Sequence, residues 1–117
     1  MSRDHRKLSA FKLADQLVIE VYQLTRSFPG DEKFGMTSQI RRAAVSVAAN
    51  LVEGCARETE KEYRHFCNIS FGSLRETGYF LDLAVRLKFV TNDEAQACLC
   101  LYDEASRVLA GLIRSLK

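Results

Sequence analysis

Histidine, cysteine and carboxylate side chains are the groups in this sequence that could bind a metal ion or act in catalysis. One of the two histidines lies in Glu62-Tyr63-Arg64-His65, which matches the Glu-x-x-His element of di-iron helical bundles. A di-iron site needs that element twice, together with two more inward carboxylates, and the chain has it once. Glu62 is better explained as the partner of Thr59 in a capping box at a helix start. We therefore expect no metal centre.

The four cysteines are Cys55, Cys67, Cys98 and Cys100. Cys98 and Cys100 fail as a chelating pair, because side chains two positions apart on a helix point about 200° away from each other. One thiol should face the core and the other should face outward. No signal peptide is recognisable at the start of the chain, so we expect reduced thiols, most of them buried, in a cytoplasmic protein.

Motifs for phosphate binding or nucleophilic catalysis do not occur: there is no glycine-rich phosphate loop, nucleophile elbow or Walker pattern. The longest mostly apolar run, Ala43 to Val52, is far shorter than the roughly 20 residues that cross a bilayer. We therefore expect a protein that is not an enzyme, needs no cofactor and has no membrane partner.

Basic residues form two clusters that could contact RNA or DNA. Arg57, Lys61 and Arg64 share one side of the turn into the third helix, and Arg41 and Arg42 lie a few turns earlier. The alternative is a solvated surface, which the neighbouring glutamates at 58, 60 and 62 neutralise. The formal net charge of +2 is too small to require a nucleic-acid partner. No aromatic platform interleaves these basic residues, so we expect salt-dependent phosphate contacts without base stacking.

The elements that would position these residues are helices. The chain has one proline and six glycines in 117 residues, which leaves few turns and favours an all-helical protein. Apolar residues recur every three or four positions in four segments. Pro29-Gly30 ends the first segment, and Thr59 and Thr91 each precede a glutamate by three residues, which is typical of helix starts. We predict helices at about 9–27, 37–56, 59–88 and 91–116. They would form one domain over residues 1–117, an all-α antiparallel up-down-up-down four-helix bundle.

The second predicted helix has more apolar surface than one core requires. Around the direction of Val47, the helical wheel places an apolar arc roughly 200° wide, which Val45, Ala48 and Val52 extend beyond the core-facing side. A helix that covers a single core needs an arc of about 100° or a little more. We expect another subunit to bury the excess.

The other side of this helix carries polar residues at steps of three or four, so that they lie along one line: Gln39, Arg42, Ser46, Asn50, Glu53 and Arg57. This line is either a solvated face or a partly buried network that fixes the register of helices or subunits. Glu76 lies among apolar positions of the third helix and should find a partner, because an unpaired buried charge is costly. We expect it to bond to Arg41, Arg42 or Asn50.

The segment FPGDEKFGMTSQIRRAAVSVAANLVEG, residues 28–54, resembles the signature of the bacterial four-helix bundle proteins, also called the 23S ribosomal RNA intervening-sequence proteins. Gly72-Ser73-Leu74 with Glu76 is similar to the third-helix pattern of that family, and the resemblance extends from about Leu8 to Leu116. Two departures are visible. Ala48-Ala49 replaces a step that often contains proline, and Cys55 stands where an aromatic residue is common.

The resemblance implies a four-helix bundle that assembles into a ring-like homopentamer, and most family members have no established activity. Related accessory proteins of retroelements bind a reverse transcriptase and nucleic acid. The favoured interpretation is a non-enzymatic oligomeric scaffold of unestablished role that binds RNA or DNA through its basic clusters. The alternative is a purely protein-binding or structural oligomer, for example a partner of a reverse transcriptase, that does not bind nucleic acid.

Overall fold

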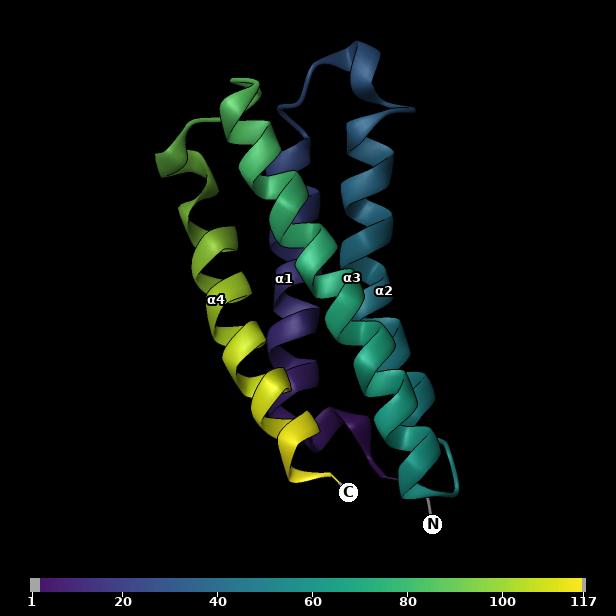
Figure 1. Cartoon of the computed structure of the whole chain (residues 1–117). Coiled ribbons are helices and arrows are strands. Elements are labelled where there is room, and N and C mark those ends of the chain that lie inside the picture. Colours follow the sequence, from purple (N-terminus) through teal and green to yellow (C-terminus); the bar gives the residue numbers. More distant parts are fainter. Residues whose placement is uncertain (1–2, 117) are drawn as a thin grey trace.

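The chain forms four long helices, and the computed structural model describes residues 3–116 (Figure 1). Two short 3-10 helices, η1 and η2, precede the first and second long helices. In order, the elements are η1 (His5–Lys7), α1 (Ser9–Thr25), η2 (Gly30–Glu32), α2 (Met36–Cys55), α3 (Glu60–Arg86) and α4 (Asn92–Ser115). No strand occurs among the described residues, and the predicted all-α fold with four helices is confirmed.

The starts of α3 and α4 have the predicted side-chain caps. Thr59 Oγ1 accepts a hydrogen bond from the Glu62 backbone N–H at 3.1 Å. At α4, Thr91 Oγ1 accepts from the Glu94 N–H at 3.1 Å, and Glu94 Oε1 accepts from the Thr91 N–H at 2.8 Å. The second pair is a complete capping box, in which each residue satisfies a backbone donor of the other.

The end of α3 lies two residues before the predicted one, because Lys88 adopts a left-handed conformation with φ of 64°. The Phe89 N–H then bonds to the Ala84 carbonyl and the Lys88 N–H to the Val85 carbonyl. These two bonds are the pattern of a Schellman motif, which satisfies the last carbonyls of a helix and usually has glycine at the left-handed position.

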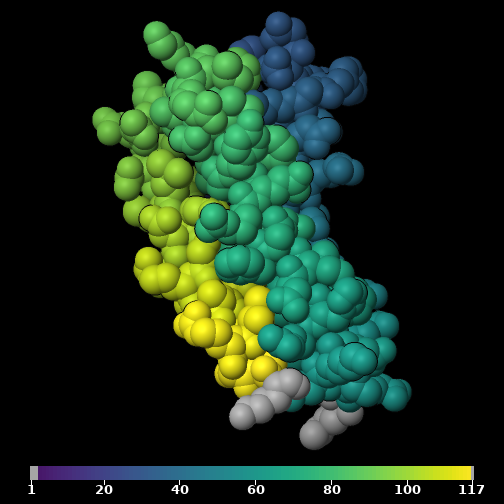
Figure 2. Space-filling view, in the orientation of Figure 1, coloured from purple at the N-terminus to yellow at the C-terminus, as the bar shows by residue number. Residues whose placement is uncertain are grey.

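Each long helix packs against two others. α1 contacts α2 and α4, and α3 contacts the same two helices, with the most extensive contact between α2 and α3. Figure 2 shows α3 and α4 covering one face of an elongated molecule that measures 45 × 24 × 19 Å. Large side chains from all four helices are completely enclosed, among them Leu17, Ile40, Leu51, Leu81 and Leu109.

The cysteines lie mostly inside this core as free thiols. Cys55, Cys67 and Cys98 are buried, and Cys100 is exposed. The predicted opposite orientation of Cys98 and Cys100 is therefore confirmed. Burial raises the pKa of the Cys67 thiol and that of the Cys98 thiol to about 11 each. Over the described part of the chain, no helix combines the length and apolarity needed to cross a membrane.

Candidate functional site

Most of the predicted functional residues lie on α2, and they are distributed over three sides of this helix. One side enters the core. A second side meets α3. The third faces outward and holds an apolar ridge formed by Val45, Ala49, Val52 and Ala56. Val45 is 40% exposed and Val52 37%, whereas Ala48 is 9% exposed and belongs to the core. The surplus of apolar surface on α2 therefore lies in this outward ridge, without Ala48.

Small polar side chains join α2 to α3. Ser46 Oγ and Ser73 Oγ share a hydrogen bond of 2.8 Å, and Asn50 Nδ2 donates to the Ser46 carbonyl and to Ser46 Oγ. Ser70 Oγ, fully buried, donates to the Val47 carbonyl at 2.7 Å. Ser46 and Asn50 thus belong to a half-buried hydrogen-bond network between α2 and α3. This network restrains the position of the two helices relative to each other.

The network includes partners that sequence reasoning missed. Ser70, Ser73 and Thr77 on α3 are the missed members, and Ser70 and Thr77 are fully buried. Thr77 Oγ1 donates to the Ser73 carbonyl at 2.9 Å. Their positions at 70, 73 and 77 follow helical spacing, so small hydroxyl residues on a core-facing side were the available signal.

The remaining members of the predicted polar line are in solvent or near it. Gln39, Arg42 and Glu53 are exposed. Arg57 Nη2 lies 3.5 Å from Glu53 Oε1, in an ion pair whose side chains are 38% and 53% exposed. An exposed pair of this kind contributes little to stability.

The bond predicted for Glu76 is wrong. Glu76 is exposed, and it makes no hydrogen bond or ion pair within residues 3–116. Each expected partner has a different environment. Arg41 turns toward α1, where its Nε donates to Thr25 Oγ1 at 2.8 Å, and Asn50 turns toward Ser46. Glu76 and Arg42 line the same hollow of about 300 Å³ without bonding to each other.

The predicted basic residues do not form one patch. Lys61 and Arg64 are exposed in the first turns of α3, beside Arg57. Arg41 lies 16 residues before Arg57 on α2, a distance of about 24 Å along a helix. Glutamates 58 and 62 line the same shallow hollow as Arg57, so carboxylates are interleaved with this cluster.

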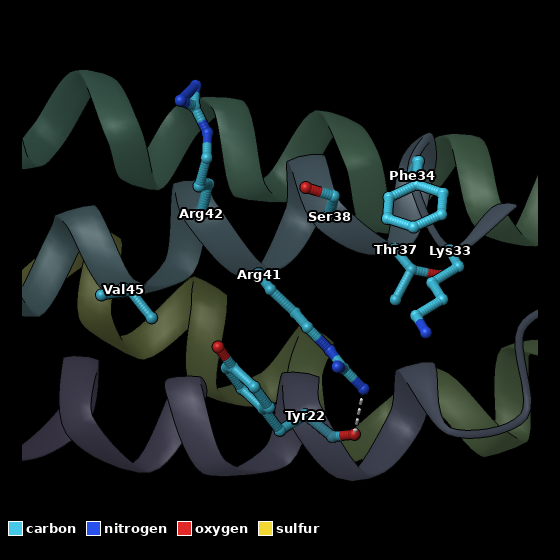
Figure 3. A pocket seen from close by; sticks show the side chains of 8 residues that line it. All are labelled: Tyr22, Lys33, Phe34, Thr37, Ser38, Arg41, Arg42 and Val45. Carbon is cyan, nitrogen blue, oxygen red and sulfur yellow. Dashed lines mark hydrogen bonds between the residues drawn. The ribbon is translucent and has the colours of Figure 1, made fainter.

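Arg41 and Arg42 lie at the other end of α2 and point in different directions. Figure 3 shows Arg41 reaching toward α1 and Arg42 pointing away from it. Arg41 crosses a groove of about 450 Å³ between α1, α2 and the segment that precedes α2. Eight residues line this groove and none is acidic: Tyr22, Lys33, Phe34, Thr37, Ser38, Arg41, Arg42 and Val45.

The groove corrects the expectation that no aromatic platform accompanies the basic clusters. Tyr22 comes from α1, 19 residues before Arg41, and Phe34 comes from the segment between η2 and α2. The Arg41 guanidinium carbon lies 4.5 Å from the centroid of the Tyr22 ring, and the Lys33 Nζ lies 5.6 Å from that of Phe34. Packing of α1 against α2 brings Arg41 and the Tyr22 ring together, whereas Lys33 and Phe34 are neighbours in the sequence.

Within the described range, no three histidine, cysteine, aspartate or glutamate side chains are grouped so that they could hold a metal ion. Glu62 is occupied at the start of α3, where its N–H and its Oε1 both bond to Thr59 Oγ1.

Comparison with known proteins agrees with this architecture. A family model described as 23S rRNA-intervening sequence protein matches residues 6–111, nearly the whole chain. A solved structure with the same fold is that of a protein of unknown function of the S23 ribosomal protein family from Bacteroides thetaiotaomicron VPI-5482. It is 20% identical, with a TM-score of 0.79 over 89% of this chain and 97% of the other. No curated protein matches the sequence significantly.

Proposed function

The chain belongs to the 23S rRNA-intervening sequence protein family, and we propose that it acts as a non-enzymatic oligomeric scaffold that binds RNA or DNA. The observation that carries the oligomeric part of the proposal is the outward ridge of α2, formed by Val45, Ala49, Val52 and Ala56. Two of them, Ala49 and Ala56, are small and allow another helix to approach closely, and together the four form an apolar strip on the exposed side of a helix.

In this proposal the ridge is covered by a second copy of the chain. The antiparallel up-down-up-down bundle would repeat around a ring of five copies, the number that the resemblance to the family implies. An interface of this kind must bury roughly 800 Å² on each partner, so the ridge would be its centre and the polar residues beside it the rim. The free thiols are in keeping with a cytoplasmic protein.

Nucleic acid would bind through the basic residues, and a ring would repeat each of them by symmetry. Repetition raises the strength of binding to one long strand without any new kind of contact. Arg41, Arg42, Arg57, Lys61 and Arg64 are the candidates. Arg41 is favoured because no carboxylate lines the groove that it crosses, whereas Arg42 also shares a hollow with Glu76.

Oligomerisation is tested by light scattering on Ala49→Glu, with Ala97→Glu as the matched control. Both alanines are exposed on helices, and each new carboxylate would lie four residues from an existing one, Glu53 or Asp93. We expect the unchanged protein to have five times the 13.3 kDa mass of one chain. Ala49→Glu should lower that mass and Ala97→Glu should leave it unchanged. A monomeric unchanged protein at micromolar concentration would disprove the scaffold.

Nucleic-acid binding is tested by measuring the affinity of the protein for a structured RNA at increasing salt concentrations. The series starts at ~50 mM salt, where phosphate contacts are strong. A second candidate function applies if the oligomer forms but no RNA or DNA binds. The protein would then be a protein-binding accessory or structural oligomer, for example a partner of a reverse transcriptase. The carboxylates interleaved with Arg57, Lys61 and Arg64 favour this alternative, because they weaken the field of that cluster.

A further inference from the structure

Phe34 is the most exposed large apolar side chain among the described residues, with 89% of its surface accessible. The segment that carries it is nevertheless held in place. The Lys33 N–H bonds to the Gly30 carbonyl and the Gly35 N–H to the Glu32 carbonyl, while Glu32 Oε1 accepts from the Met36 N–H at 3.0 Å. The ring is therefore presented to solvent by a fixed turn. Binding of a ligand to it would cost little conformational entropy, because the backbone is already ordered.

Arg41 is held just as firmly on the opposite side of the groove. Its Nε donates to Thr25 Oγ1 at 2.8 Å, and Thr25 is itself 3% exposed and donates to the Val21 carbonyl. A second donor, Nη2, lies 3.4 Å from the Tyr22 carbonyl, and the guanidinium lies over the Tyr22 ring. A guanidinium has five N–H donors, so three remain for a ligand after these two contacts within the described chain.

The charge of the groove selects an anion. Lys33 and Arg41 supply its positive charge, no acidic residue lines it, and the exposed Ser38 adds a hydroxyl that can donate or accept. Figure 3 shows the Phe34 ring at one end of the groove and the Arg41 side chain extending across it toward Tyr22. An anion near Arg41 could therefore belong to a ligand that also carries a flat group near Phe34.

We infer that this groove binds one unstacked nucleotide of a single-stranded nucleic acid, with its base on Phe34 and its phosphate at Arg41 and Lys33. The inference rests on the proposed nucleic-acid binding and narrows it to single strands. Phosphate oxygens match the guanidinium fork, and unpaired bases stack on aromatic rings and on arginine planes. A duplex keeps its bases stacked on each other, so it could use the cations but not the ring. An acidic peptide without an aromatic residue would supply the charge but not the flat group.

The experiment compares two oligonucleotides of about 12 nucleotides, a length within the ~4–16 that single-strand sites cover. One is a labelled adenine oligoribonucleotide, and the other has the same backbone with abasic positions. Anisotropy is measured at ~50 mM salt for the unchanged full chain, Phe34→Ala, Phe34→Leu and Phe34→Trp. The control is Tyr79→Ala, which removes another exposed aromatic ring, 55% accessible, from α3 outside the groove.

We expect the unchanged protein to bind the adenine strand about 5- to 150-fold more tightly than the abasic one, the equivalent of ~1–3 kcal/mol of stacking. Phe34→Ala and Phe34→Leu should lose most of this preference, whereas Phe34→Trp and Tyr79→Ala should keep it. Because Phe34 is so exposed, its replacement should leave the unfolding midpoint unchanged.

Three results would overturn the inference. If the unchanged protein binds both strands equally and Phe34→Ala has no effect, the groove does not stack a base, while general nucleic-acid binding still stands. If Phe34→Ala changes the oligomeric mass, a second copy of the chain covers the groove. If the unchanged protein binds neither strand and no structured RNA, both this inference and the proposed nucleic-acid function fail.

Discussion

The two interior glycines of α3 should respond differently to the same substitution. An added Cβ at Gly72 would meet nothing within 4 Å, so Gly72→Ala adds a methyl group in open space. At Gly78 the added atom would lie 2.7 Å from Tyr102 Oη on α4 and would collide with the ring as well. Gly78 is therefore the place where α3 accommodates the tyrosine of its neighbour.

The expected changes in the free energy of unfolding combine the higher helix propensity of alanine with the cost of overpacking. Alanine is more favourable than glycine in a helix interior by ~1 kcal/mol, so Gly72→Ala should stabilise the protein by about that amount. Gly78→Ala has the same gain, but the forced movement of Tyr102 costs ~1–3 kcal/mol, as overpacking does elsewhere. The free energies of unfolding of the two variants should therefore differ by ~1–3 kcal/mol, with Gly78→Ala the less stable.

Urea unfolding followed by circular dichroism measures this difference, at one protein concentration because an oligomer's stability depends on it. Melting temperatures should separate by roughly 4 °C per kcal/mol for a chain of this size. Gly78→Ala made in a Tyr102→Leu background should become as favourable as Gly72→Ala, because the obstructing ring is gone. If Gly78→Ala stabilises the parent protein as much as Gly72→Ala does, the argued contact between α3 and α4 is wrong.

Two further predictions concern a strained residue and the buried thiols. Lys88→Gly should raise the free energy of unfolding by about 1 kcal/mol, since φ of 64° is costly for a residue with a Cβ, and an unchanged urea midpoint would contradict this. Burial raises the pKa of Cys67 and Cys98 from near 9.0 to about 11, so above pH 9.0 the unfolded chain releases protons that the folded chain keeps. The contribution of the two buried, protonated thiols to the free energy of unfolding is then complete below pH 9.0 and is lost as the pH rises toward about 11. The urea midpoint should fall less over this range in Cys67→Ala/Cys98→Ala than in the parent, and an equal fall would contradict the prediction.

The helix starts could be read from the sequence because their chemistry is local. Thr59 and Thr91 bond to groups only three residues away, so the spacing of two residue types contains the information. The end of α3 depends on Lys88, which adopts the left-handed conformation in place of the usual glycine. No local signal marks that position, and the helix was accordingly predicted to be two residues longer.

Side-chain directions across helices could not be read in the same way. Arg41 and Glu76 have opposite charges, but Arg41 donates its hydrogen bond to Thr25 on α1 instead. Thr25 is buried among the apolar residues of α1, so the sequence pattern does not identify it as a polar partner. The groove was missed for a related reason. Its two rings come from different parts of the chain, Tyr22 from α1 and Phe34 from the turn before α2, and only the packing of α1 on α2 places Tyr22 beside Arg41.

The arrangement of α2 allows assembly and ligand binding to use one rigid element. Bonds from Ser46 to Ser73 and from Ser70 to the Val47 carbonyl restrain α2 against α3. The outward ridge and the groove both lie on the helix that these bonds restrain, and Val45 belongs to both. An oligomer built on the ridge would therefore set the spacing of neighbouring grooves. A strand long enough to reach two grooves would bind more tightly than one that reaches a single groove, so its affinity would depend on assembly as well as on charge.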